Sequence, residues 1–291
     1  MFSLTTGAAV ALVIDVFNTH DVKLARVLDK FLNPGDVLVG DRAFCSYADL
    51  VFLQERNCDA VFREHQSRQY GDKRLKQKRF SSYDRLEEWQ KPKSRPESLS
   101  KQEFSRLPKT LTVRAIKYYI APPGYRTKHV ILITTLLDEE LYPATEIMRL
   151  YGLRWDVELD LRHLKTTLGM DILRSKTPSM VKKEIYAYLL AYNLLRTVMW
   201  EAGTTRGINP LRLSLQGTRQ HLNNFAGELA SSSTTKRQQL YHILLELIAH
   251  KSVAERKGRH EPRVRKRRPK SYPLMQKPRT ELRHQLMTAQ V

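Results

Sequence analysis

The stretch Tyr151-Gly-Leu-Arg154-Trp-Asp-Val-Glu158-Leu-Asp-Leu-Arg-His-Leu-Lys165 decides the fold, because it lies inside a clear helical pattern. We predict a helix from about Ala144 to Met170. At about 100° per residue, one stripe about 60° wide collects Tyr151, Arg154, Glu158 and Lys165. An apolar stripe beside it consists of Leu150, Leu153, Val157, Leu164 and Leu168. The helix is therefore expected to bury the apolar stripe and to present the other stripe to a solvent cleft.

The side chains of this second stripe suit phosphodiester chemistry. Glu158 can ligate a hard divalent cation, while Arg154 and Lys165 can hold phosphate oxygens through charge-assisted hydrogen bonds. Tyr151 and Trp155 can stack on a base or a sugar. The alternative is a solvated helix whose charges pair with one another. The complete spacing Tyr-x2-Arg-x3-Glu-x6-Lys favours the site.

This spacing resembles the signature of the "insertion sequence four" family of bacterial DDE transposases. The surrounding sequence, residues 141–144, 168–178 and 190–196, is also similar to that family. The resemblance covers roughly residues 2–280. It implies an α/β fold with an RNase H-like catalytic core interrupted by a β-rich insertion. It also implies metal-dependent DNA cleavage and strand transfer at transposon ends.

The composition indicates a polyanionic partner. Fifty Lys and Arg against thirty Asp and Glu give a net charge of +20 over 291 residues, and nucleic acid is the expected partner. A basic protein of the membrane surface is the competing interpretation, but the chain has no sustained basic amphipathic helix and no apolar run long enough to span a bilayer. An RNA-binding protein is disfavoured because no RNA module is recognisable.

Cysteine and histidine usage excludes other classes of site. Cys45 and Cys58 are too few for a disulfide framework or a zinc site, and the nine His lack ligand spacing. A reducing compartment fits this usage. The first residues lack a basic leader and a cleavage site, so a secretory signal is not expected. We expect a cytoplasmic, nucleoid-associated protein.

The N-terminal part predicts alternating strands and helices. Residues 8–18 are apolar and β-branched and indicate a strand, residues 21–32 a helix, and residues 37–41 a short apolar strand that ends in Asp41. Ligands of open α/β sheets bind where strands end, so Asp41 is a candidate metal ligand. The alternative is a helix-capping aspartate. Gly-Asp41-Arg-Ala-Phe-Cys-Ser-Tyr resembles the second catalytic aspartate of the family, which favours the ligand.

A helix over residues 47–56 and a strand over residues 59–64 complete a βαβ unit. Arg63 and His65, at the end of this strand, could face the same crevice as Asp41, although a lone His is more often structural. No firm role follows for either.

Residues 67–138 break this rhythm and predict a β-rich insertion. Residues 110–120 and 129–137 are strands, and basic loops over residues 68–79 and 91–96 suit phosphate contact. Solvated surface charge is the alternative for any single Lys of these loops. Trp89 is either a stacking residue or a core anchor.

The C-terminal part is helical and then basic. Helices are predicted over residues 178–202 and 234–250, and the sequence from Glu255 to Lys270 has almost no apolar residues. This tail is expected to be disordered alone and to bind DNA by counterion release, the alternative being a solubilising tail. The predicted parts are 1–66 (incomplete first part of the core), 67–138 (insertion), 139–250 (helical second part of the core) and 251–291 (basic tail).

The family's catalytic site needs three carboxylates, and the sequence supplies two candidates, Asp41 and Glu158. By family topology the first aspartate lies on a central strand upstream of residues 8–18, so Asp15 is not expected to be a ligand. We therefore expect an N-terminally truncated transposase that lacks the first, central strand. It is either an enzyme that needs upstream sequence or a DNA-binding remnant without catalysis. The resemblance implies double-stranded DNA as partner and a homodimer on DNA. The expected ion is Mg²⁺, with Mn²⁺ as a substitute.

Overall fold

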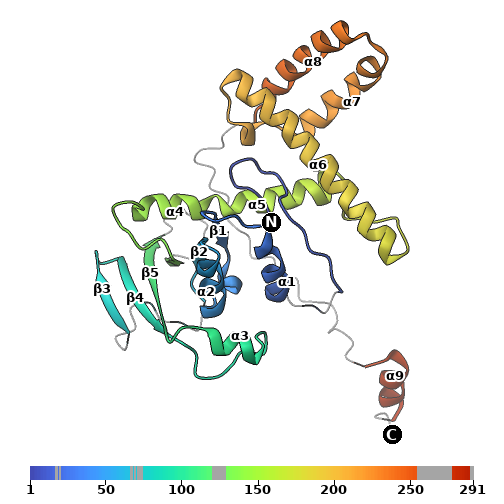
Figure 1. The fold of residues 1–291 in the computed structure, drawn as a ribbon. Coiled ribbons are helices and arrows are strands. Elements are labelled where there is room, and N and C mark those ends of the chain that lie inside the picture. The colour runs from blue at the N-terminus through green and yellow to red at the C-terminus, as the bar shows by residue number, and fades with distance from the viewer. Residues whose placement is uncertain are drawn as a thin grey trace. The chain divides into compact units, whose positions relative to one another are not determined.

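The computed structural model describes residues 1–16, 19, 21–65, 68, 70, 75–119, 129–253 and 277–288. A six-stranded sheet organises the first half of the chain, and its strand order is β1-β2-β6-β5-β4-β3 (Figure 1). The strands are β1 (Val37–Gly40), β2 (Asp59–Arg63), β3 (Lys76–Arg79), β4 (Asp84–Gln90), β5 (Thr110–Tyr119) and β6 (His129–Thr134).

β1 and β2 form the predicted βαβ unit. They are parallel and are connected by α2 (Tyr47–Glu55), whose first turn is capped by the Ser46 side chain. The other strands follow as antiparallel neighbours, from β6 beside β2 to β3 at the far edge. The strands of residues 67–138 therefore extend the sheet that β1 and β2 begin. In the described part of the chain, β1 pairs with β2 alone, and its other edge carries no strand.

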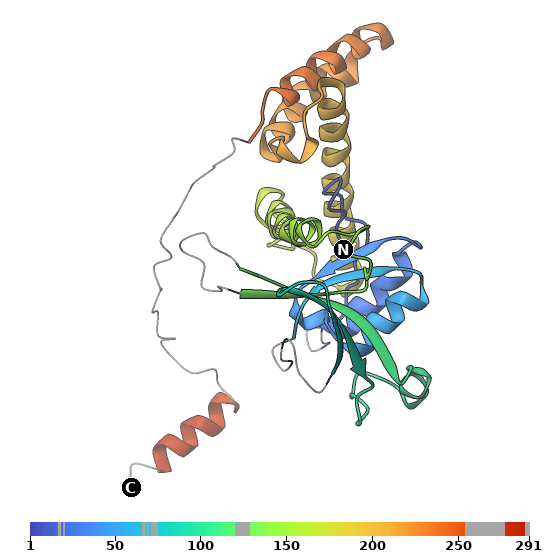
Figure 2. The same cartoon turned by 90° about the vertical axis from the view of Figure 1, so that its left-hand side faces the viewer.

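Helices cover both faces of the sheet, because its buried strands are apolar on both sides. On one face, Phe62 and its neighbours pack against Leu50 of α2. On the other face, Val61 and Leu132 pack against Ile147 of α4 (Ala144–Gly152). Figure 2 shows these layers, with α4 and the helix that continues it seen nearly end-on over the sheet.

Short helices complete this half of the chain. The predicted helix 21–32 is observed as α1 (Asp21–Leu28) followed by one 3₁₀ turn, η1 (Asp29–Phe31). A second 3₁₀ turn, η2 (Arg42–Phe44), follows β1, and α3 (Lys101–Arg106) begins with a capping box between Ser100 and Glu103.

The helix predicted over residues 144–170 is present but divided. It consists of α4, α5 (Arg154–Arg162) and a π turn, η3 (His163–Thr167). Leu153 separates α4 from α5, although its backbone stays near helical angles, so the two helices continue in line (Figure 1). We call α4, α5 and η3 together the signature helix.

A buried arginine fixes the start of the signature helix. Arg114 of β5 pairs with Asp84 of β4 at 2.5 Å, and both side chains are buried. The same guanidinium donates hydrogen bonds to the carbonyl oxygens of Asp138 (3.2 Å) and Tyr142 (2.7 Å), just before α4. The entry to the signature helix is thereby bonded to the sheet.

The following helices form a second core. The predicted helix 178–202 is α6 (Pro178–Arg206), and the helix predicted over 234–250 is α8 (Thr234–Ala249). Between them lie η4 (Pro210–Arg212) and α7 (Leu215–Ser231), which was not predicted. The buried side chains of this core include Leu164 of the signature helix, with Tyr192, Leu195, Met199, Leu244 and Ile248.

The predicted strand over residues 8–18 was wrong for its described residues, 8–16. Ala9 forms only an isolated bridge with Phe2. The backbone N–H and C=O of Ala9 bond instead to the side-chain amide of Asn193 on α6, both at 2.9 Å. A β-branched run becomes a strand only beside a partner strand, and here a side chain takes that place. Residues 17 and 18 lie outside the described residues.

The C-terminal residues 277–288 belong to a separate unit of the chain. They contain α9 (Arg279–Thr288), so this part of the predicted disordered tail is helical. The dense basic run, residues 255–270, lies outside the described residues. Among the described helices, none combines the length and hydrophobicity needed to cross a membrane.

Candidate nucleic-acid and metal site

Asp41 lies directly after the last residue of β1, as predicted. Its backbone is still extended, and its carboxylate Oδ1 accepts a hydrogen bond from the backbone N–H of Arg42 at 2.8 Å, capping η2. Capping uses one carboxylate oxygen. Asp41 therefore caps η2 through this bond. It also lies at the carboxyl end of a parallel strand, where ligands of open α/β sheets bind.

The strand register places Asp41 beside Arg63. Val39 pairs with Val61, and Asp41 and Arg63 each follow two positions later on adjacent parallel strands. Val39 and Val61 pack in the cluster that contains Tyr151. Since side chains two apart share a face of a sheet, Asp41 and Arg63 are directed to the face that the signature helix covers.

Tyr151 is the residue of the signature helix on which the charges of Asp41 and Arg63 act. It is only 5% exposed and belongs to the apolar cluster under α4. Burial raises the pKa of its hydroxyl; the charge of Arg154 opposes the rise, and that of Asp41 adds to it. Tyr151 is therefore a buried anchor within the electrostatic reach of Asp41, although it was expected to face a solvent cleft.

Arg154 links the buried and exposed parts of the site. Its guanidinium carbon lies 5.7 Å from the ring centre of Tyr151 and 5.3 Å from that of Trp155. It also approaches the carboxylate of Glu158 at 3.6 Å. Its Nε is buried and has no hydrogen-bond partner. The guanidinium is thus held in place by two aromatic rings and one carboxylate, with donor capacity left over.

The three remaining predicted side chains of the signature helix are on the outer surface. Trp155 is 47% exposed, Glu158 is half-exposed and Lys165 is exposed. Lys165 lies within the π turn, where the backbone bonds from residue i+5 to residue i, as from Leu168 N to His163 O at 2.9 Å. The expected common stripe assumed 100° per residue, an assumption that does not extend past His163.

The buried stripe was predicted incorrectly at one position. Leu153 is 38% exposed, whereas Leu164 is buried and Leu150 is partly buried. Leu153 occupies the junction between α4 and α5, where the uniform helical rotation is interrupted. The inner face of α5 carries the buried Asp160, which sequence reasoning missed.

Two further residues complete the cluster around Tyr151. Arg63 was noted only as a possible neighbour of the crevice, and Tyr118 of β5 was missed. Burial raises the pKa of Tyr118, Tyr151 adds to the rise, and the charges of Arg63 and Arg154 oppose it. The alternation of residues 110–120 would have placed Tyr118 on the same face as Ile116.

The described residues supply two candidate carboxylates for a metal centre. No group of three His, Cys, Asp or Glu that could hold an ion occurs among them. The third carboxylate considered, Asp15, accepts hydrogen bonds from Val16 N at 2.8 Å and Thr19 Oγ1 at 2.9 Å. These bonds, and more weakly Lys182, lower its pKa. Asp41 and Glu158 fit a hard cation by chemistry, but the pair is short of the three carboxylates that two ions need.

Trp89 and one of the predicted phosphate contacts belong to the core. Trp89 is buried in the apolar cluster that includes Leu50 of α2, and the guanidinium carbon of Arg68 lies 3.5 Å from its ring centre. Burial lowers the pKa of Arg68. In contrast, Lys76, Lys78 and Arg79 of β3 are exposed at the sheet edge, where they are available for phosphate contact.

The sequence of the chain is similar to those of known proteins. Residues 1–194 match the family described as "Transposase DDE domain". The transposase InsG for insertion sequence element IS4 of Escherichia coli (strain K12) is 33% identical over 149 residues, which are 50% of this chain and 34% of that protein. The putative transposase InsL for insertion sequence element IS186A of the same strain is 41% identical over 71 residues, 24% of this chain and 19% of that protein. The chain thus covers about a third or less of these relatives.

Proposed function

The chain belongs to the family of proteins with a transposase DDE domain, and from this premise we propose that it acts in DNA transposition. The proposed reaction is metal-dependent cleavage and strand transfer at transposon ends. The observation that carries the proposal is the register of β1 and β2, which directs Asp41 and Arg63 toward the helix that bears Tyr151, Arg154 and Glu158.

The proposal gives each side chain a role. Arg63, Arg154 and Lys165 bind phosphate oxygens by charge-assisted hydrogen bonds. Tyr151 holds Arg154 from beneath, and Trp155 stacks on a base. Arg154 is held by its contacts with two aromatic rings and Glu158 before DNA arrives, which reduces the ordering cost of binding.

Membership of the family implies dependence on a divalent metal ion. We propose Mg²⁺, because carboxylate oxygens are hard ligands, and Mn²⁺ as a substitute. Asp41 and Glu158 are the proposed ligands. When bound, such ions would activate an attacking oxygen and stabilise a leaving one.

The third ligand is proposed to come from a strand paired with β1. An RNase H-like core would place such a strand at the edge of β1 that is unpaired in the described residues. A carboxylate at the end of this strand would lie beside Asp41, since adjacent parallel strands end at the same crevice. A homodimer on DNA and a cytoplasmic, nucleoid-associated location complete the proposal.

A second candidate function is DNA binding without catalysis. It is supported by the described residues, among which no group of three His, Cys, Asp or Glu could hold a metal ion. Arg63, Arg154, Lys165 and the basic tail would suffice for binding.

One assay separates the two candidates. The 291-residue chain is incubated with a labelled duplex and Mg²⁺ or Mn²⁺, and strand nicking and DNA binding are recorded together. Glu158→Gln is the test variant, and Glu146→Gln, an exposed glutamate of α4, is its matched control. Nicking that Glu158→Gln alone abolishes supports the enzyme. Binding without nicking means that these 291 residues bind DNA without a complete metal centre, as the second candidate states, and nicking that survives Glu158→Gln contradicts the proposed site.

A further inference from the structure

The π turn of the signature helix is held on both sides by arginines from other helices. Lys165 is the middle residue of this turn, His163–Thr167, and its side chain is exposed. A π turn is an uncommon departure from the α-helix and often occurs at functional sites. The contacts that maintain it therefore bear on where Lys165 points.

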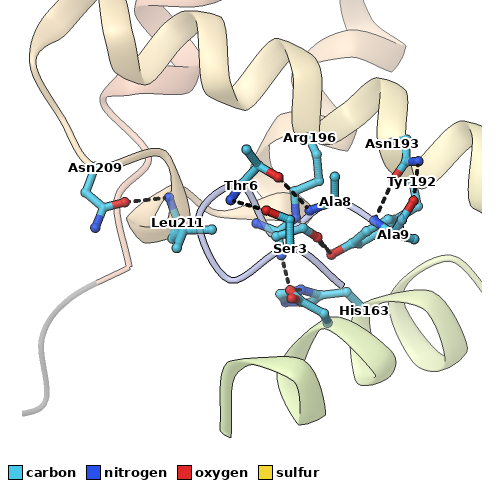
Figure 3. A network of polar contacts seen from close by, with 12 residues as sticks. Ser3, Thr6, Ala8, Ala9, His163, Tyr192, Asn193, Arg196, Asn209 and Leu211 are labelled. Carbon is cyan, nitrogen blue, oxygen red and sulfur yellow. Dashed lines mark hydrogen bonds and ion pairs between the residues drawn. The ribbon is translucent and has the colours of Figure 1, made fainter. Parts of the chain in front are cut away.

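The first arginine acts one turn before Lys165. Arg196 of α6 pairs with the carboxylate of Asp160 on α5, and the two side chains are 6% and 7% exposed. Its Nε donates to the Tyr192 hydroxyl at 2.9 Å, and that hydroxyl donates to the Gly7 carbonyl oxygen at 2.6 Å. Figure 3 shows Arg196 and Tyr192 extending from α6 toward the loop of residues 1–9, with His163 of the signature helix on the other side of that loop.

In the described part of the chain, no other charged cation competes with Arg196 for the Asp160 carboxylate. His163 lies 4.0 Å from the same carboxylate oxygen, but burial, with the charges of Arg196 and Arg162, lowers its pKa to about 4. Burial raises the pKa of Asp160, and Arg196 opposes that rise. Arg196 is thus the cation that keeps this end of α5 in place.

The second arginine acts at the end of the turn. Arg219 of α7 donates a hydrogen bond to the carbonyl oxygen of Thr167. Two backbone hydrogen bonds follow the turn, each spanning six residues: Met170 N–H donates to the Leu164 carbonyl oxygen and Asp171 N–H to that of Lys165, both at 3.2 Å. The chain around Lys165 is thereby fixed at both ends, while the lysine side chain itself stays free to reach solvent.

A buried ion pair is weak evidence for stability, because desolvation offsets most of the attraction and an apolar pair of similar volume is often as stable. A positional role is the better-attested reason to keep one. We propose that Arg196 and Arg219 are positioning residues, which hold the π turn so that Lys165 meets a DNA phosphate. The inference rests on the proposed function, since it assumes that Lys165 contacts DNA.

The test measures how the DNA-binding constant of the 291-residue chain depends on salt. Each lost phosphate contact makes the slope of log K against log salt less steep by about 0.9. We expect Lys165→Ala to make this slope less steep by about 0.9, the contribution of one phosphate contact. The double variant Asp160→Leu with Arg196→Met, which removes the buried charges together, should reduce it equally. Adding Lys165→Ala to the double variant should then cause no further loss.

Two outcomes would overturn the inference and are distinguishable. If Lys165→Ala leaves the slope unchanged, Lys165 does not bind phosphate, and that part of the proposed function fails as well. If Lys165→Ala lowers the slope by the same amount in the wild-type chain and in the double variant, Lys165 binds phosphate without help from Arg196. The positioning role alone then fails.

Two further variants keep the test independent of folding. Arg196→Lys preserves the charge opposite Asp160 and should recover a slope closer to that of the wild type than the double variant does. Arg219→Met removes the bond to Thr167 without leaving a buried charge unpaired. It should make the slope of log K against log salt less steep, while the thermal unfolding midpoint stays within a few degrees of the wild-type value. Wild-type slopes for Arg219→Met and for the double variant would contradict the proposal.

Discussion

Two aromatic residues of the signature helix, four positions apart, have opposite surroundings. Tyr151 is 5% exposed and contributes to the core under α4, whereas Trp155 is 47% exposed beside Glu158. Both were predicted to stack on nucleic acid. Burial gives Tyr151 a packing role, while stacking by the exposed Trp155 stays a prediction, so their substitution should affect different properties.

We expect Tyr151→Ala to lower the free energy of unfolding by about 3 kcal/mol, because it leaves a cavity in the core. Trp155→Ala should change that free energy by less than about 0.5 kcal/mol, yet weaken DNA binding by about 1–3 kcal/mol through lost stacking. Urea denaturation and a titration with labelled DNA measure the two quantities. Equal stability losses in the two variants would refute the assignment.

A buried glutamate should make stability depend on pH. Burial raises the pKa of Glu64 from 4.5 to about 7, Glu87 adds to the rise and Arg68 opposes it. Since the folded pKa exceeds the unfolded one, protonated Glu64 stabilises the fold fully below pH 4.5. This contribution is lost as the pH rises through about 7.

Glu64→Gln should therefore remove part of the decline in unfolding free energy between pH 5 and pH 8. The variant and the wild type are compared by urea denaturation at several pH values, so that the titration of other groups cancels. Identical pH profiles would show that Glu64 titrates normally in the folded chain.

At the scale of elements, the loop of residues 1–9 depends on Gly7. Its φ of +69° lies in the left-handed region, and a Cβ placed there would approach the Arg196 guanidinium carbon at 2.9 Å. Gly35 has a φ of +90°, but nothing lies within 4 Å of its Cβ position. Substitution of either glycine would therefore strain the backbone, but only at Gly7 would the new side chain also clash with a neighbour, Arg196.

Gly35→Ala should cost about 1–2 kcal/mol from strain alone, and Gly7→Ala should cost more, because Arg196 would have to move. Thermal unfolding of both variants checks the order. A Gly7→Ala variant as stable as Gly35→Ala would mean that the loop of residues 1–9 yields without disturbing Arg196.

Sequence periodicity predicted the elements that make their own hydrogen bonds or pair locally. The βαβ unit, α6, α8 and strands β5 and β6 were anticipated for this reason. Residues 8–16 were not, because the backbone of Ala9 bonds to the side chain of Asn193, 184 residues away, and the N–H groups of Val10 and Ala11 bond to the Met1 carbonyl oxygen. The π turn is contacted by Arg219 of α7, and contacts between helices are not contained in the periodicity of the sequence.

The candidate site was predictable in its residue types and less so in its geometry. Asp41 follows β1 as expected, and the spacing of Arg154 and Glu158 brings them to 3.6 Å of each other. Arg63 and Tyr118 approach Tyr151 through strand register, which requires knowing which strands are neighbours. The roles assigned to these residues stay predictions.

At the scale of the whole molecule, the net charge of +20 should produce steeply salt-dependent DNA binding. Nine Lys and Arg lie between Arg256 and Lys270. A chain ending at Val253 should show a shallower slope of log K against log salt, since each phosphate-bound cation contributes about 0.9.

The control for this truncation is the unfolding midpoint of residues 1–253, which should equal that of the 291-residue chain, because the tail residues 277–288 form a separate unit. Both chains are titrated with the same duplex at several salt concentrations. An unchanged slope would mean that the tail is only solubilising.

The guanidinium of Arg114 joins β4, β5 and the residues before α4 in one set of bonds. An inserted or deleted residue between Thr134 and Ala144 would pull the carbonyl oxygens of Asp138 and Tyr142 out of its reach. Length variation among related chains should therefore avoid this segment. An alignment of family members should show gaps in surface loops and a constant spacing between the Thr134 position and the signature tyrosine.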